Sequence, residues 1–116
     1  LYIYFTVIRM KENEFGHLVP FNLKKEIPYT TNTVVQRTIV DKASRIVQLM
    51  AFDYGKVLAI TSDGTQFHVL IEGKAEMVID EVSTYLQPGD SIIVPPGTNY
   101  TLEANEKFKI LTINLE

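Results

Sequence analysis

Short apolar runs separated by turn-forming residues dominate the chain from Val34 onward. The breaks read Asp-Tyr-Gly, Ser-Asp-Gly, Pro-Gly-Asp and Pro-Pro-Gly, which are typical of tight turns. Strands at this regular spacing, without a long helical period, predict an all-β sandwich or barrel. The predicted strands are Val34–Val40, Arg45–Phe52, Val57–Thr61, Gln66–Glu72, Ala75–Asp80, Thr84–Leu86, Ser91–Val94, Tyr100–Leu102 and Phe108–Leu115.

Alternation along three of these strands predicts which side chains point inward. Ala75, Met77 and Ile79 alternate with a mostly charged face, so we expect them inside. The same argument places Tyr100 inside. The strand Gln66–Glu72 is different, because neither face is plainly polar, and we expect it to be covered on both sides. Its two faces are Gln66, His68 and Leu70, and Phe67, Val69 and Ile71.

The first 33 residues predict an N-terminal strand followed by an extended arm. Leu1–Ile8 is β-branched and aromatic, which favours a strand, and it is far shorter than the ~20 residues that span a bilayer. Pairing with the sheet edge of a second subunit would protect it from aggregation. Pro20 and Pro28 break any long helix in residues 11–33, leaving at most one turn near Asn22–Glu26. Met10 is an alternative natural start.

These observations divide the chain into residues 1–33, an arm expected in dimer contacts, and residues 34–116, the barrel. With 11 Lys and Arg against 14 Asp and Glu, the net charge of −3 and the lack of a basic cluster argue against nucleic-acid binding. No membrane span is expected. The absence of cysteine excludes disulfides and thiolate sites and fits a cytoplasmic protein. Only His17 and His68 can supply imidazole chemistry.

Two segments within Gln66–Leu102 carry a resemblance to the cupin family. Val69–Asp80 (VLIEGKAEMVID) resembles the hairpin that follows the first cupin motif. Leu86–Thr98 (LQPGDSIIVPPGT) is similar to the second motif, with Gly89, Pro95 and Gly97 at its spacing. The resemblance implies a small single-domain jelly-roll barrel, a double-stranded β-helix, with a pocket between its sheets.

The positions that bind metal in this family are changed in the sequence. The resemblance implies two His and a Glu or Gln from the first motif and one His from the second. In this sequence Tyr100 stands where the second motif has its His, and Gln66 stands where the first motif has its Glu or Gln. Because an amide and a phenol do not suit a divalent transition metal, we expect a degenerate site with no metal and no cofactor. The paired His positions fall on Ile60 and Ser62, or on Ala59 and Thr61.

The expected pocket residues come from the inward faces of the predicted strands. His68 has three interpretations at this point: a buried histidine hydrogen-bonded to Gln66 or Tyr100, a ligand contact, or the single imidazole of a displaced metal site. No catalytic residue can be assigned. The expected pocket residues are Gln66, His68, Tyr100, Met77 and Gln48.

Three functions follow as hypotheses, and whether the protein is an enzyme is left open. The first is a metal-free barrel that binds a small molecule as a sensor or carrier. The second is a metal-independent isomerase or epimerase that uses His68 and Tyr100 as base and acid. The third is a solid structural barrel. A homodimer is expected in each case, because a lone barrel would expose a large apolar surface.

Overall fold

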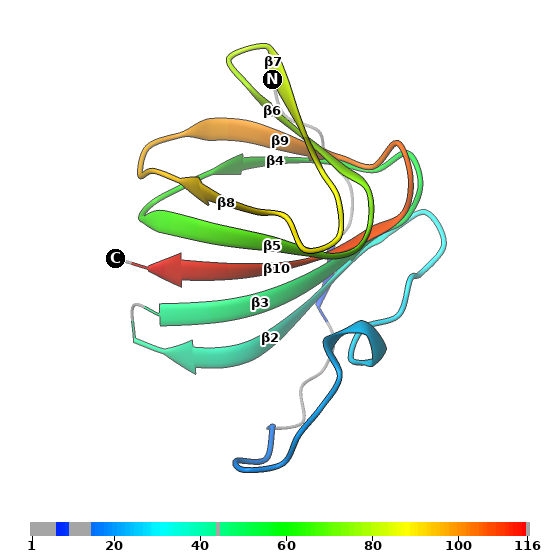
Figure 1. Cartoon of the computed structure of the whole chain (residues 1–116), viewed down its shortest axis with the longest axis vertical. Helices are drawn as coiled ribbons and strands as arrows, with labels where there is room; N and C mark the ends of the chain where they lie inside the picture. The colour runs from blue at the N-terminus through cyan, green and yellow to red at the C-terminus, as the bar shows by residue number, and fades with distance from the viewer. Residues whose placement is uncertain (1–6, 10–14, 44, 116) are drawn as a thin grey trace.

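Two β-sheets face each other in the computed structural model, which describes residues 7–9, 15–43 and 45–115 (Figure 1). The large sheet has the strand order β1 (Val7–Arg9), β2 (Val34–Lys42), β3 (Arg45–Phe52), β10 (Phe108–Leu115), β5 (Thr65–Gly73) and β8 (Ser91–Val94). The small sheet has the order β4 (Val57–Thr61), β9 (Asn99–Glu103), β6 (Ala75–Ile79) and β7 (Val82–Leu86). The all-β prediction is confirmed.

Every strand predicted from Val34 onward is present, with small differences at the ends. β2 runs to Lys42 rather than Val40, past an irregularity in its pairing with β3 between Thr38 and Val40. The predicted turn of helix near Asn22–Glu26 is the 3-10 helix η1 (Leu23–Lys25). The Asn22 side chain caps it by accepting a hydrogen bond from the Lys24 amide at 3.0 Å. The described part of the chain contains no helix with the length and apolar character needed to cross a membrane.

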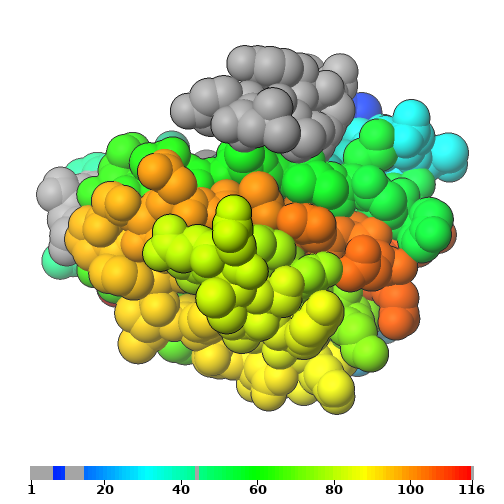
Figure 2. Space-filling model, turned by 90° about the horizontal axis from the view of Figure 1, so that it is seen from above, coloured from blue at the N-terminus to red at the C-terminus, as the bar shows by residue number. Residues whose placement is uncertain are grey.

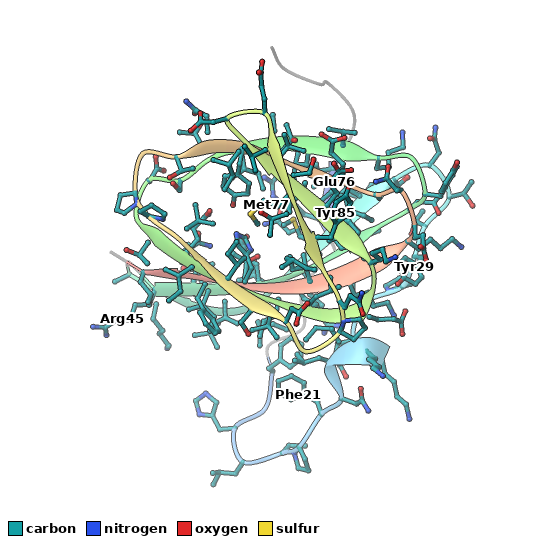
Figure 3. The ribbon with its side chains drawn as sticks, turned by 45° about the horizontal axis from the view of Figure 1, so that its top comes forward. Phe21, Tyr29, Arg45, Glu76, Met77 and Tyr85 are labelled. Carbon is teal, nitrogen blue, oxygen red and sulfur yellow. The ribbon has the colours of Figure 1, made fainter. Side chains whose placement is uncertain are left out.

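The core lies between the two sheets. The rings of Phe52 and Phe108 stack there with their centroids 4.4 Å apart. Ala75 and Met77 are fully buried, as predicted, and Ile79 packs against the same cluster while partly buried. Figure 3 shows Met77 between the sheets, whereas Tyr85 lies on the exposed β7. The alternation pattern therefore assigned the inner face of the small sheet correctly.

A second cluster packs on the outer face of the large sheet, where the arm crosses it. Ile27 of the arm is buried against Val35, Leu49 and Ala51. The Lys109 ammonium reaches the carbonyl of Lys24 at 2.6 Å and fixes η1 to the sheet. β5 is accordingly covered on its inner face and in part on its outer face. Ile71 packs against this cluster, while Phe67 and Val69 are only partly buried.

The N-terminal strand pairs within its own chain. β1 runs parallel to β2, with Val7 opposite Val34 and Arg9 opposite Gln36. The described part of the predicted strand thus pairs with the edge of β2 in the same chain. The rest of the predicted strand, residues 1–6, lies outside the described residues. The β6–β7 hairpin protrudes at the top of Figure 1, and its yellow-green atoms lie in the centre of the view from above in Figure 2.

The turn from β5 to β6 depends on Gly73. Its φ of +84° is a left-handed conformation that disfavours a side chain. A Cβ atom at this position would also lie 1.9 Å from the carbonyl oxygen of Lys107. Gly55 has the same φ of +84°, but a Cβ there would meet nothing within 4 Å. The two glycines therefore separate backbone strain from a steric clash.

We expect Gly73→Ala to reduce the free energy of unfolding by about 3 kcal/mol or more, because strain and overpacking combine. Gly55→Ala, with strain alone, should cost about 1–2 kcal/mol. Urea unfolding of both variants checks the difference. Equal losses would show that the close approach to Lys107 is not a constraint on the fold.

Candidate functional site

The register of the large sheet collects polar side chains on its inner face. Thr112 of β10 lies opposite both Gln48 of β3 and His68 of β5. One step along, Asn114 of β10 lies opposite Gln66 of β5. Directly opposite residues of antiparallel strands share a face, so residues distant in sequence form one polar patch.

The small sheet contributes Tyr100 from β9. The Pro-Pro-Gly turn that precedes β9 positions this residue, because it is bonded to Ser62. The Gly97 amide donates to the Ser62 carbonyl at 2.7 Å, and the Ser62 amide donates to the Thr98 carbonyl at 2.9 Å. Ser62 also donates its hydroxyl to the Pro95 carbonyl at 2.7 Å. β9 then starts at Asn99 and places the Tyr100 side chain between the sheets, where it is 4% exposed.

A chain of hydrogen bonds links the two sheets through five buried or partly buried side chains. The His68 ring contacts Thr112 Oγ1 through Nδ1 at 2.7 Å and Tyr100 Oη through Nε2 at 2.9 Å. The Tyr100 hydroxyl donates to Oε1 of Gln66. The Gln66 amide then donates to Asn114 Oδ1 at 2.8 Å. We call these five residues the His68 network.

The donors and acceptors of the His68 network determine its protonation. Because Tyr100 has one O–H, which it donates to Gln66, its oxygen must accept the proton of His68 Nε2. A neutral imidazole protonated on Nε2 leaves Nδ1 as an acceptor for the Thr112 hydroxyl. Every ring nitrogen is satisfied with His68 neutral, and no proton is missing or in excess.

Burial strengthens this assignment. It lowers the pKa of His68 from 6.5 to about 4, because a charged imidazole would lose its hydration. It also raises the pKa of the Tyr100 phenol well above its usual value of 10. Both groups are therefore neutral at pH 7. The His68 network presents fixed neutral dipoles, with neither a ready base nor a ready acid.

A cavity of about 480 Å³ opens beside the His68 network. Four of the five expected pocket residues line it: Gln48, Gln66, His68 and Tyr100. Met77 does not: it lies opposite Leu102, two residues along β9 from Tyr100, and packs in the hydrophobic core. The remaining lining residues are not among the predicted pocket residues, although Thr112 and Asn114 alternate with apolar residues along β10 and so could have been predicted. The lining residues missed are Val7, Arg9, Gln36, Met50, Leu58, Ile60, Thr61, Asp63, Thr112 and Asn114.

The side chains at the family's metal positions do not fit a divalent transition metal. The oxygen of Gln66 already accepts from Tyr100. The paired His positions of the first motif fall in one alignment on Ile60 and Ser62. Ile60 packs against the core, and the Ser62 hydroxyl donates to the Pro95 carbonyl. Within the described ranges, no group of three or more His, Cys, Asp or Glu side chains is placed to hold a metal ion. The donor set lacks both imidazoles and carboxylates.

Comparisons with known proteins agree with this architecture. A family model described as Cupin domain matches residues 55–114. No curated protein matches the chain significantly. Because every structural likeness described next is below 25% identity, these structures support the fold alone.

Three solved structures illustrate the similarity. A cupin superfamily protein from Desulfitobacterium hafniense has a TM-score of 0.82 at 20% identity, over 91% of this chain and 98% of that one. A Streptococcus pyogenes protein of unknown function has a TM-score of 0.82 at 24% identity, over 90% and 92%. A cupin 2 conserved barrel domain protein from Leptotrichia buccalis has a TM-score of 0.79 at 24% identity, over 83% of this chain and 47% of that one.

The lowered pKa of His68 predicts a loss of stability in mild acid. Between pH 6.5 and about 4 the unfolded chain binds a proton at His68 that the folded chain does not, so stability falls as the pH falls. From pH 7 to pH 5 the loss should be about 2 kcal/mol, as measured by urea unfolding. His68→Gln should lose this dependence, while His17→Gln, in the exposed arm, should keep it. An unchanged slope in His68→Gln would contradict a buried neutral imidazole.

Removing the Tyr100 hydroxyl should open the His68 network without removing the ring. Tyr100→Phe leaves His68 Nε2 and Gln66 Oε1 without their buried partner, which we expect to cost about 2–4 kcal/mol of unfolding free energy. Tyr85→Phe is the control, because the Tyr85 hydroxyl is 3.5 Å from Glu76 on an exposed strand. Thermal or urea unfolding compares the two variants. Similar small losses would mean that the network contributes little to stability.

Proposed function

The chain belongs to the cupin family, and on that premise we propose that its barrel binds a small uncharged polar molecule without a metal ion. The observation that carries the proposal is the cavity of about 480 Å³ between the sheets. Its volume is within the range of about 300–1,000 Å³ found for small-molecule sites. A cavity of this size also argues against a barrel packed solid for a purely structural role.

The lining supports a ligand with hydrogen-bonding groups. Gln36 and Gln48 line the cavity and are half-buried, and neither side chain forms a hydrogen bond with the described part of the chain. Each primary amide offers two N–H donors and one carbonyl acceptor. Opposite them, Leu58 and Ile60 of β4 present apolar surface. A molecule with hydroxyl or amide groups on one side and carbon on the other complements both walls.

The charges of the lining favour an uncharged ligand. Arg9 and Asp63 are the ionised side chains among the described lining residues, and they carry opposite charges on exposed positions. Deeper in, the His68 network is neutral, because burial lowers the pKa of His68 to about 4. A buried ionised ligand would find no opposite charge there and would lose its hydration.

The geometry does not favour the alternative of an isomerase or epimerase. An acid–base pair must hold the reacting atom between its two groups. His68 Nε2 and Tyr100 Oη instead contact each other at 2.9 Å, and the second His68 nitrogen is bonded to Thr112. The pKa of His68 is lowered and the pKa of Tyr100 is raised, so both pKa values move away from pH 7. Binding, as in a sensor or carrier, requires no such exchange of protons.

Titration with neutral probes tests the proposal. D-glucose, myo-inositol, nicotinamide and uracil would be added separately, each to about 10 mM, a concentration that detects millimolar affinity. We expect at least one probe to shift the side-chain amide resonances of Gln36 and Gln48 in nitrogen–proton correlation spectra. Gln48→Leu should weaken that probe's binding about tenfold or more, by removing a hydrogen-bonding group at nearly constant volume.

The control is Gln87→Leu, which removes an amide from an exposed turn outside the cavity. It should leave binding unchanged. The proposal fails if none of the four probes perturbs Gln36 or Gln48, or if Gln48→Leu and Gln87→Leu have the same effect.

A further inference from the structure

The hydrogen bonds of the His68 network all run in one direction. Gln66 Oε1 is a carbonyl oxygen, so the Tyr100 hydroxyl is the donor of the bond between them. Tyr100 therefore accepts from His68 Nε2, and His68 Nδ1 accepts from the Thr112 hydroxyl. The Gln66 amide then donates to Asn114 Oδ1 at 2.8 Å. Every bond has its donor on the Thr112 side and its acceptor on the Asn114 side.

A network that runs in one direction leaves donors unused at its far end. Asn114 accepts the last bond through Oδ1, and the two N–H groups of its amide have no hydrogen-bond partner among the described residues. Gln66 gives one of its two N–H groups to Asn114, and the other likewise has no partner in the described ranges. The Asn114 end of the network therefore lacks acceptors.

The unused donors impose a stronger requirement than the unused lone pairs of the same two side chains. The oxygens of Gln66 and Asn114 each accept one bond already. A carbonyl oxygen with one bond is tolerated in protein interiors, whereas an N–H group without an acceptor is rare. Gln66 is buried, Asn114 is partly buried, and both line the cavity. Water can supply the acceptor in the free protein, and a ligand that displaces this water must supply it again.

The other amides of the cavity impose no such requirement. Gln36 and Gln48 form no hydrogen bond with the described part of the chain, so each can turn to present either its N–H groups or its oxygen. Gln66 cannot turn, because its oxygen and its nitrogen are both bonded within the network. Asn114 is held through Oδ1, which leaves its nitrogen as the free group. The selection between donors and acceptors is therefore made at Gln66 and Asn114.

We propose that the ligand of the cavity is a small neutral carbonyl compound, such as a ketone, an amide or a lactam, whose oxygen accepts a hydrogen bond from Asn114 Nδ2. This inference rests on the proposed function and names the chemical class that the cavity binds. A carbonyl oxygen accepts two hydrogen bonds, so the free N–H group of Gln66 can share it. Leu58 and Ile60 present apolar surface to the carbon skeleton. A ligand with only donors at this position would leave the N–H groups unpaired.

Two neutral five-membered rings test the class. Cyclopentanone has a carbonyl acceptor and no donor, whereas pyrrole has an N–H donor and no acceptor lone pair outside its ring electrons. Each would be added to the full chain up to about 50 mM, a concentration that detects millimolar affinity. We expect cyclopentanone to shift the side-chain amide resonances of Asn114 and Gln66 in nitrogen–proton correlation spectra. It should bind about tenfold more tightly than pyrrole, or more, because only cyclopentanone satisfies the free N–H groups.

A matched pair of substitutions tests the role of Asn114. Asn114→Asp keeps an oxygen for Gln66 and replaces the free N–H groups by a carboxylate oxygen of the same shape, so it should weaken cyclopentanone binding about tenfold or more. Asn99→Asp is the control, because it makes the same change and adds the same charge at an exposed residue that does not line the cavity. Asn99 Oδ1 likewise accepts a hydrogen bond, from Thr61 at 2.6 Å. The Gln66 resonances, present in both variants, report the binding, which Asn99→Asp should leave unchanged.

The inference and the proposed function fail on different results. Pyrrole binding as tightly as cyclopentanone, or equal effects of the two substitutions, would overturn the carbonyl class and leave the proposed function standing. The same holds if cyclopentanone does not bind while one of the four earlier probes shifts Gln36 and Gln48. No response to any probe would overturn both.

Discussion

The hydrogen bond between His68 and Tyr100 is the constraint on which the interior of this barrel depends. It joins the large sheet to the small sheet at 2.9 Å and involves Tyr100, one of the positions that bind metal in other members of the family. The bond is a proton shared between two neutral groups, one from each sheet. The burial that keeps the pKa of His68 near 4 also keeps that bond intact at neutral pH.

Much of the interior could be predicted from alternation, because a strand's period of two assigns faces directly. Alternation alone puts Gln66 and His68 on one face of β5 and Tyr100 inside the barrel. Alternation does not give the depth of a residue along the barrel axis. Met77 is on the same inner face, but its position along the barrel axis puts it in the core and not in the cavity lining. The partners Thr112 and Asn114 follow from the register of β10, which only long-range pairing determines.

The large sheet presents two different faces through the same alternation. Its inner face holds Gln48, Thr112 and His68, and its outer face holds Val47, Ile113 and Phe67, one residue away on each strand. The proposed binding cavity therefore lies against a layer whose other side is apolar. The arm differs, since its course depends on individual contacts such as that of Lys109 with Lys24, which no periodic pattern encodes.

The nitrogen chemical shifts of the His68 ring test the central claim, that a neutral hydrogen-bonded network includes Gln66 and Tyr100, two of the positions that bind metal in other members of the family. With the ring nitrogens labelled, the account predicts a neutral imidazole at pH 6, protonated on Nε2 and unprotonated on Nδ1. This state should persist to about pH 5, because the pKa is near 4. A doubly protonated ring at pH 6, or a proton on Nδ1 instead of Nε2, would contradict the account.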